Sequence, residues 1–395
     1  ARSRAYEAGR AAAGPAEAVP LAEADGRVLA EPLVALTDLP AFPTSSIDGW
    51  AVRGGAPWRP VGRVLAGSTP GPLTEDGTCV EIATGAMVPE GSAALLRVEE
   101  SARDDEGLVS GVPRPLPEWR MPGDEAGRGE ELLPAGTPVD FAVLGMAATC
   151  GHDTVPVRPR PRAALLVFGD ELLTSGPPGD GRVRDSLTPL VPAWLRRSGA
   201  TVVPEAIRGP VQDTLEAHVE AIRHGLSVAD VVCTTGGTMH GPVDHLHPAL
   251  AELGAEYVVN TVAVRPGFPM LLARVTGPDG RPKFLAGLPG NPQSAVIALV
   301  SLVAPLLAGL TGRELPALSR VRATAPVPGR GAYTHLALAA LDDEGRVTPA
   351  GHVGSSMLRG LARSHGFVVI RPDGAAAAGD TTAFLPLPLY PGERP

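Results

Sequence analysis

The sequence predicts a multidomain α/β protein with a central parallel sheet, and three observations favour this fold class. Continuous apolar runs alternate with amphipathic segments between residues 161 and 312, as strands and helices alternate in parallel sheets. Short apolar runs separated by glycine and proline turns occupy residues 45–122 and 316–395, which predicts two smaller β units. A chain of 395 residues also exceeds one ordinary core, so we expect several domains.

Residues 1–44 and 123–160 are expected to form one discontinuous, helical N-terminal domain. Alanine, glutamate and arginine are frequent up to about Pro40, and apolar residues recur there at helical spacing. The apolar run at 139–148 predicts a second helix, which we expect to pack against the first. Residues 45–122, inserted between these parts, are expected to form a small β domain.

The segment 161–312 predicts the central α/β domain. Residues 163–168 are continuously apolar and are followed by Gly-Asp-Glu, which is typical of a strand buried on both faces. Right-handed crossovers would join such strands, and ligands of these sheets bind beyond the carboxyl ends of the strands. Further strands are expected at 201–203 and 229–234, and helices at 187–197 and 215–224.

Residues 316–395 predict a small C-terminal β-barrel, because short strands such as 321–325 and 367–370 are separated by turn residues. The longest apolar stretch, 295–310, precedes this barrel. It is shorter than the ~20 residues that span a bilayer, so we expect a buried helix and no membrane partner.

Composition argues against several kinds of partner and site. The formal net charge of -9 and the lack of a basic run argue against nucleic-acid binding. The three cysteines, Cys79, Cys150 and Cys233, are far apart, which argues against a disulfide framework or a thiolate zinc site. The N-terminus lacks the apolar segment of a secretory signal, so we expect a cytoplasmic protein.

Three loops at predicted strand ends carry residues suited to ligand binding. The first, residues 169–172, places Asp170 and Glu171 where ligands of parallel sheets bind, and carboxylate oxygens suit magnesium. For this loop alone, an ordinary exposed turn is the favoured alternative.

The second loop, residues 234–238, contains Gly236 and Gly237, whose conformational freedom lets backbone N–H groups approach an anion closely. A helix expected from Val243 would favour phosphate at its N-terminus, and Asp244 could hold a metal that bridges to that phosphate. A simple strand-to-helix turn fits this pattern equally well.

The third loop, residues 288–294, lies between a predicted strand at 284–286 and the apolar helix. Pro292 suits the first turn of that helix, and Gly290 and Asn291 would present backbone and amide groups to a ligand. A tight turn is the alternative here too, but three such loops at the strand ends of one sheet favour a binding site.

A histidine-rich segment superficially resembles the metal loop of the metallo-β-lactamase class. It contains His240, Asp244, His245 and His247. Pro242 stands where that pattern has a ligand, and His245 and His247 would face different sides of a helix. We therefore expect no dedicated zinc site, and a zinc-dependent hydrolase is only a third hypothesis.

Segments along the whole chain resemble the MoeA/gephyrin E-domain family in order and spacing. Residues 45–53, SSIDGWAVR, are similar to the family signature S-x-x-D-G-[YW]-A-[VL], and residues 351–355, GHVGS, resemble its C-terminal GHxGS. Further similar segments are 82–91, 120–136, 169–172, 235–244, 265–267 and 288–292.

This resemblance implies four domains, with a MogA-like central domain, and an elongated homodimer. It also implies molybdopterin molybdenumtransferase activity, in which adenylylated molybdopterin and molybdate yield molybdenum cofactor and AMP in the presence of Mg²⁺. Such a protein would work beside a MogA-type adenylyltransferase and molybdoenzymes.

The resemblance also assigns roles to individual residues. Glu171 and Asp244 would hold Mg²⁺ at the nucleotide phosphates, and Arg265 replaces a family lysine while keeping a positive charge for molybdate or phosphate. The positions that match catalytic residues are Asp48, Glu125, Glu171, Asp244, Arg265 and Ser355. Those that match cofactor-binding residues are Thr235, Gly236, Gly237, Asp185, Gly290 and Asn291.

Several positions depart from the family pattern. Thr261 and Phe268 stand where the family has lysines, and Met239 stands where it has a small serine. Residues 208–210, Arg-Gly-Pro, replace an acidic turn after the second strand, so its carboxylate is expected to be lost. Leu187 replaces an asparagine. The chain has a single lysine among 34 basic residues, so arginine for lysine is expected, but Thr261 and Phe268 remove cations.

These departures leave two main hypotheses. The first is an active molybdenumtransferase, which the retained carboxylates, the loops and Ser355 favour. The second is a catalytically impaired MoeA-like paralogue that acts as a pterin-binding or scaffolding protein, because each lost close charge weakens anion binding by ~1–3 kcal/mol. We favour the first.

Overall fold

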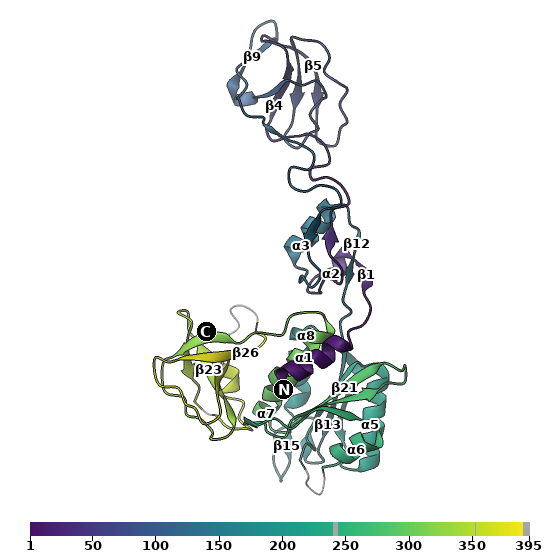
Figure 1. The fold of residues 1–395 in the computed structure, drawn as a ribbon, viewed down its shortest axis with the longest axis vertical. Helices are drawn as coiled ribbons and strands as arrows, with labels where there is room; N and C mark the ends of the chain where they lie inside the picture. Colours follow the sequence, from purple (N-terminus) through teal and green to yellow (C-terminus); the bar gives the residue numbers. More distant parts are fainter. Residues whose placement is uncertain (240–243, 352, 390–395) are drawn as a thin grey trace. The chain divides into compact units, whose positions relative to one another are not determined.

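The computed structural model describes residues 1–239, 244–351 and 353–389, which divide into two compact units. Unit 1 comprises Ala1–Glu17, Gly26–Val28 and Arg158–Pro395. Unit 2 comprises Ala18–Asp25 and Leu29–Val157. Unit 1 contains the central sheet and the C-terminal barrel, and unit 2 contains most of the shorter strands of the first half of the chain (Figure 1).

The central sheet of unit 1 has six strands in the order β16-β13-β17-β21-β20-β18. Four of them are parallel: β13 (Arg162–Phe168), β16 (Thr201–Val211), β17 (Val231–Thr235) and β21 (Pro282–Leu288). The remaining two, β20 (Leu271–Thr276) and β18 (Glu256–Asn260), are antiparallel. The short connection from β20 to β21 explains this difference from a purely parallel sheet, because a parallel pair needs a long crossover.

Helices cover both faces of this sheet, as the apolar run at 163–168 predicts. Leu165 and Val167 of β13 pack in one core with α4 (Leu187–Arg197), whereas Leu166 packs in another with α5 (Leu215–Val228) and α6 (Leu246–Glu252). The predicted helices at 187–197 and 215–224 are confirmed. The helix expected from Val243 begins at Leu246, and residues 240–243 lie outside the described chain.

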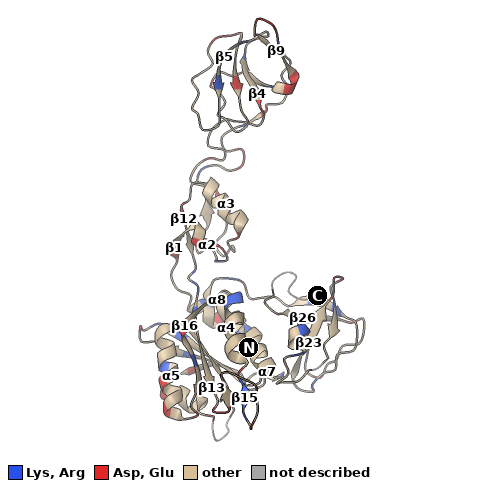
Figure 2. Ribbon diagram, turned by 180° about the vertical axis from the view of Figure 1, so that it is seen from behind, with Lys and Arg blue, Asp and Glu red and all other residues tan. Residues whose placement is uncertain are grey.

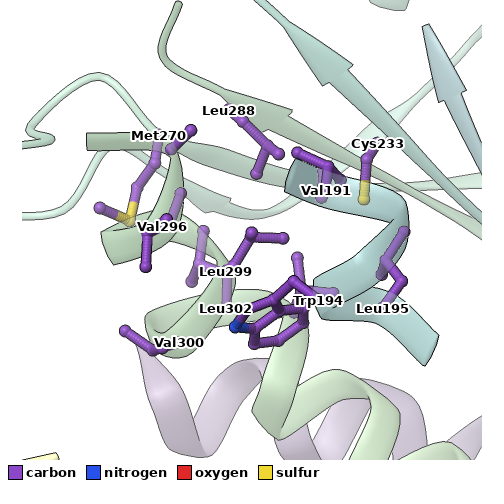
Figure 3. Packing of buried hydrophobic residues seen from close by; sticks show 14 of the residues in the cluster. Val191, Trp194, Leu195, Cys233, Met270, Leu288, Val296, Leu299, Val300 and Leu302 are labelled. Carbon is purple, nitrogen blue, oxygen red and sulfur yellow. The ribbon is translucent and has the colours of Figure 1, made fainter. Parts of the chain in front are cut away.

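The apolar helix after β21 is buried, as predicted. It consists of α7 (Pro292–Ala298), a π-helical segment η2 (Leu299–Val303) and α8 (Ala304–Leu310). Its length and composition would allow it to cross a membrane, yet 94% of it is buried inside the protein. Figure 3 shows Leu299 and Leu302 packed beside Trp194 of α4.

The N-terminal helix α1 (Arg2–Ala11) packs against α8 through two facing glycines. A Cβ on Gly9 would lie 2.3 Å from the Leu306 carbonyl oxygen, and one on Gly309 would lie 2.2 Å from the Tyr6 carbonyl oxygen. The two helices therefore touch backbone to backbone.

Two predictions for the N-terminal region were wrong. The chain does not remain helical to Pro40, because prolines at 15, 20 and 32 interrupt it. Helix α3 (Phe141–Thr149) contacts α2 and belongs to unit 2, whereas α1 belongs to unit 1 and packs on α8. The elements that follow α1 are β1 (Glu17–Pro20), α2 (Leu21–Ala24) and β2 (Leu33–Val34).

The C-terminal region of unit 1 forms the predicted β-barrel. Five strands close on themselves because the last of them, β25, pairs back onto β23. A short strand, β19 (Val264–Arg265), joins the barrel by pairing in parallel with β23. The barrel strands in spatial order are β23 (Thr334–Leu341), β24 (Arg346–Pro349), β22 (Ser319–Ala323), β26 (Thr381–Pro386) and β25 (Gly366–Ile370). The helical turn η3 (Leu361–Arg363) precedes β25.

Unit 2 is built mainly of short strands around a four-stranded sheet with the order β5-β6-β4-β7. Trp50, Trp58 and Leu96 form part of its core. Basic and acidic residues are dispersed over both units (Figure 2). The elements of unit 2 and their connections are β3 (Thr44–Ser45), β4 (Gly49–Arg53), β5 (Arg59–Val64), β6 (Thr78–Ile82), β7 (Ala94–Arg97), η1 (Val98–Glu100), β8 (Ser101–Arg103), β9 (Val109–Gly111), β10 (Trp119–Arg120), β11 (Glu131–Leu133) and β12 (Thr154–Val157).

Candidate functional site

The first two predicted loops leave the central sheet side by side. Strands β13 and β17 are neighbours, and Val167 pairs with Thr235 at their carboxyl ends. A Cβ on Gly236 would lie 3.3 Å from the Phe168 carbonyl oxygen, so the glycine loop passes directly over the end of β13. The parallel register thus places Glu171 and the glycine loop at one edge of the sheet.

The third loop meets the second at the same edge. The N–H of Gly236 donates to the Leu288 carbonyl oxygen over 3.0 Å, and a Cβ on Gly290 would lie 3.7 Å from the Gly236 Cα atom. Gly236 and Gly237 have φ angles of +88° and +65°, which residues other than glycine rarely adopt. The two glycines therefore let backbone N–H groups come close to a ligand, as phosphate-binding loops require.

The two carboxylates assigned to Mg²⁺ come from neighbouring loops. Glu171 is exposed, and its Oε2 atom lies 2.5 Å from the place where Gly169 would carry a Cβ, so the side chain folds back over that glycine. Within the part of the chain that the structure describes, Glu171 forms no ion pair. Asp244 is half-buried and interacts with another group.

Carboxylates such as Glu171 and Asp244 are oxygen ligands of the kind that Mg²⁺ prefers. Mg²⁺ commonly binds one or two carboxylates together with substrate phosphates and water. No cluster of three metal-binding side chains occurs among residues 1–239, 244–351 and 353–389.

The expected loss of the acidic turn after β16 is wrong. Residues 208–210 lie inside β16, which extends to Val211, and the turn that follows contains Asp213. The Oδ2 atom of Asp213 accepts a hydrogen bond from the Asp170 N–H over 3.3 Å. A carboxylate therefore does support the loop that carries Glu171.

His218 is a buried residue of this region that the sequence did not single out. It is fully buried, stacks on Phe168 with ring centroids 3.8 Å apart, and meets the edge of the His245 ring. Its Nε2 atom lies 3.6 Å from the Asp213 Oδ1 atom, and neither ring nitrogen has a hydrogen-bond partner among the described residues. Burial lowers the pKa of His218, which keeps the ring neutral. A single histidine on an amphipathic helix carries no signal of such a position.

The lowered pKa of His218 predicts acid-sensitive stability. A histidine that is neutral in the folded state but titrates near 6.5 when unfolded binds fewer protons when folded. Its stabilising contribution is present above pH 6.5 and is lost as the pH falls towards the folded-state value. We expect the thermal midpoint to fall less between about pH 7 and pH 5 in His218→Phe, which retains the stack on Phe168. An equal fall in both proteins, measured by circular dichroism, would contradict this.

Asp185 has a structural role in the first turn of α4. Its Oδ1 atom accepts hydrogen bonds from the N–H groups of Leu187 and Thr188 over 2.8 and 3.1 Å, and the residue is buried. A carboxylate in this arrangement caps a helix. Leu187, which replaces an asparagine of the family pattern, packs in the core.

A second group of predicted residues lines a cavity of about 750 Å³ in unit 1. Arg265, Asn291 and Ser355 all face it, and they come from β19, the third loop and the barrel. The third loop therefore joins the glycine loop to this cavity. Gln293 and Ser294 of the third loop also line the cavity. Polar lining residues that the sequence did not single out are Arg330, Tyr333 and His335.

The loop that carries Ser355 is tied to the start of α7. The N–H groups of Gln293 and Ser294 donate to the Ser355 carbonyl oxygen over 2.9 and 3.4 Å, and the Gly354 N–H donates to Gln293 Oε1 over 3.4 Å. His352, in the same GHVGS segment, lies outside the described residues. These bonds hold Ser355 at the cavity wall.

His335 lies opposite Arg265 in the pairing of β19 with β23. It is buried, and its Nδ1 atom contacts the Pro328 carbonyl oxygen at 2.6 Å, so Nδ1 carries the proton. Burial lowers the pKa of His335, and the neighbouring Arg330 lowers it further. The neutral ring leaves Nε2 as a hydrogen-bond acceptor.

Asp48 and Glu125 both belong to unit 2. The Oδ1 atom of Asp48 accepts a hydrogen bond from the Thr84 N–H over 2.7 Å, and Asp48 lines a pocket of about 280 Å³ together with Arg63. Glu125 is exposed, and its N–H donates to the Leu39 carbonyl oxygen over 2.8 Å.

The histidine-rich segment is described only in part. His240 lies outside the described residues, and His247 contacts the Tyr257 hydroxyl through Nδ1 at 2.6 Å. Met239, which replaces a small serine of the family pattern, is exposed.

Three known family domains together match nearly the whole chain. Residues 2–151 match the family described as MoeA N-terminal region (domain I and II). Residues 164–309 match a probable molybdopterin binding domain, and residues 320–387 match the MoeA C-terminal region (domain IV).

Two curated relatives and one solved structure are similar to this chain. A molybdopterin molybdenumtransferase 2 of Mycobacterium tuberculosis is 32% identical over 389 residues, covering 92% of this chain and 93% of that protein. A molybdopterin molybdenumtransferase of Nostoc sp. is 31% identical over 308 residues, covering 75% and 70%. The MoeA structure from Pyrococcus horikosii has the same fold, with a TM-score of 0.80 at 23% identity, covering 98% of this chain and 99% of that one. The chain therefore belongs to the MoeA family of molybdopterin molybdenumtransferases.

Proposed function

We propose that this chain transfers molybdenum from molybdate to adenylylated molybdopterin, with release of AMP. The observation that carries the proposal is the 750 Å³ cavity, where Arg265, Asn291 and Ser355 surround a space joined to the glycine loop by residues 288–294. A cation, an amide and a hydroxyl suit an oxyanion such as molybdate, and Arg330 adds a second cation to the lining. The adjoining loop suits the phosphates of the adenylylated substrate.

The two ends of the site would have separate roles. The glycine loop binds the nucleotide phosphate through the Gly237 N–H group, and Glu171 and Asp244 hold Mg²⁺ beside it. When bound, Mg²⁺ offsets phosphate charge and polarises the bond that is broken on AMP release. Arg265 and Ser355 orient molybdate at the other end of the connecting loop.

The remaining parts of the proposal concern assembly and setting. Family membership favours a homodimer in the cytoplasm, in which Asp48 and Glu125 of unit 2 have the catalytic roles that the resemblance implies. A MogA-type adenylyltransferase would supply the adenylylated substrate, and molybdoenzymes would receive the product. Light scattering tests the oligomeric state. A monomer at the assay concentration would overturn the proposed homodimer.

The transfer itself is tested with purified protein, adenylylated molybdopterin, molybdate and Mg²⁺. We expect AMP release and a product that activates an apo-molybdoenzyme. The control omits molybdate. Tight binding of the pterin without turnover would overturn the transferase and favour the impaired, pterin-binding paralogue.

A further inference from the structure

Among the described residues, Arg265 is one of the two arginines that line the cavity, and it lies against two aromatic rings. The Cζ atom of Arg265 lies 4.5 Å from the ring centroid of Tyr333 and 5.4 Å from that of Phe268. The two rings are themselves 5.9 Å apart and meet edge to face, at 87°. All three side chains line the same cavity as Ser355.

The backbone brings these three residues together from different elements. The pairing of Arg265 with His335 places β19 next to the start of β23, directly after Tyr333. The loop after β19 then turns back, because the Val262 N–H donates to the Phe268 carbonyl oxygen over 3.2 Å. Phe268 is thereby held beside the strand that carries Arg265.

Gly267 allows this turn. Its φ angle is +100°, and a Cβ there would lie 3.3 Å from both the Ile297 Cγ2 and Met270 Cε atoms. The position of Phe268 is therefore fixed by the backbone and by the packing of the loop on α7, and not only by its contact with Arg265.

We propose that Phe268 is a positioning residue that holds the Arg265 guanidinium for an oxyanion in the cavity. This inference rests on the proposed function. It makes the replacements of lysine at positions 265 and 268 one coupled change. A planar guanidinium stacks on aromatic faces, whereas an ammonium group is a compact and strongly hydrated point charge. Phe268 in place of a second lysine removes one charge but restricts the guanidinium of Arg265.

The chemistry of the ligand follows from this arrangement. A guanidinium restrained by two rings presents its N–H groups in a fixed fork, which matches two oxygens of a tetrahedral oxyanion. The Ser355 hydroxyl and the neutral His335 ring in the same cavity add polar groups, and Arg330 adds a second positive charge. Molybdate is the oxyanion that the proposed reaction provides.

The test compares two substitutions of Phe268. Phe268→Leu keeps an apolar side chain but removes the aromatic ring, whereas Phe268→Tyr keeps the aromatic ring that faces Arg265. We expect Phe268→Leu to weaken molybdate binding about three- to tenfold, by calorimetry and as an increased KM for molybdate. The KM for adenylylated molybdopterin should stay constant, and Phe268→Tyr should bind molybdate as the unmodified chain does. Phe141→Leu is the matched control, because Phe141 is 86% exposed on α3.

A double-mutant cycle with Arg265→Lys tests the coupling directly. If Phe268 acts through Arg265, Phe268→Leu adds little to the effect of Arg265→Lys. Unchanged molybdate binding in Phe268→Leu, or full additivity of the two changes, would overturn the inference. Calorimetry separates this outcome from failure of the proposed function, since molybdate binding is measured without turnover.

Discussion

Glu171→Gln is expected to lower kcat/KM for molybdenum transfer roughly 100-fold and to raise the Mg²⁺ concentration needed for half-maximal rate. The reason is the position of this carboxylate beyond the end of β13, next to the glycine loop, where its charge would hold Mg²⁺ against phosphate. The side chain is exposed and forms no ion pair within the described chain, so its neutral replacement should leave the thermal midpoint unchanged.

Glu205→Gln provides the matched control for this change. Glu205 is an exposed glutamate of β16, and the same substitution there removes the same charge from the same sheet. Initial rates of AMP release over a range of Mg²⁺ concentrations distinguish the two variants. If Glu171→Gln kept both the rate and the Mg²⁺ dependence of the unmodified chain, Glu171 would not be a metal ligand.

The placement of Glu171 could be predicted from the sequence because it depends on one local pattern. The apolar run at 163–168 has no polar interruption, so it had to be a strand covered on both faces. The chain then leaves the sheet at Gly169, and parallel strands bring such exits to one edge. The same reasoning placed the second and third loops, whose strands β17 and β21 are neighbours.

The acidic turn could not be placed in this way, because the sequence suggests that β16 ends earlier than it does. Gly209-Pro210 is an ordinary turn signal, yet both residues lie within the strand. Proline is tolerated there since β16 is an edge strand of its sheet. Gly209 is required because a Cβ would lie 2.6 Å from the Val167 Cβ atom. The turn therefore falls three residues later, where Asp213 supplies the carboxylate.

The aromatic contacts of Arg265 could not be predicted from the sequence either. Tyr333 is 68 residues from Arg265 in the sequence numbering, and no local pattern connects them. Only the pairing of β19 with a barrel strand brings the two together. In the sequence, Phe268 indicated only a lost cation, and its contact with Arg265 emerges from the fold. Counting the lost lysines in the sequence therefore underestimated how well this cavity is suited to bind an anion.

Gly309→Ala is expected to destabilise unit 1 by about 1–3 kcal/mol, although alanine normally stabilises a helix relative to glycine. The added Cβ would lie 2.2 Å from the Tyr6 carbonyl oxygen and 2.6 Å from the Arg10 nitrogen. Because both atoms belong to the backbone of α1, no side-chain rotation relieves the clash, and α1 must move away from α8. We expect a lower thermal midpoint and faster tryptic cleavage after Arg10.

The matched control is Gly145→Ala in α3, where no atom lies within 4 Å of the added Cβ. This change should stabilise its helix by up to about 1 kcal/mol, because it carries the propensity gain without a clash. If Gly309→Ala lowers the free energy of unfolding and Gly145→Ala raises it, the contact between α1 and α8, and not helix propensity, determines the effect at Gly309. A stabilising Gly309→Ala would mean that the two helices do not touch at Gly9 and Gly309. The contact matters for the cavity as well, since α8 continues the helix whose first residues bind the loop of Ser355.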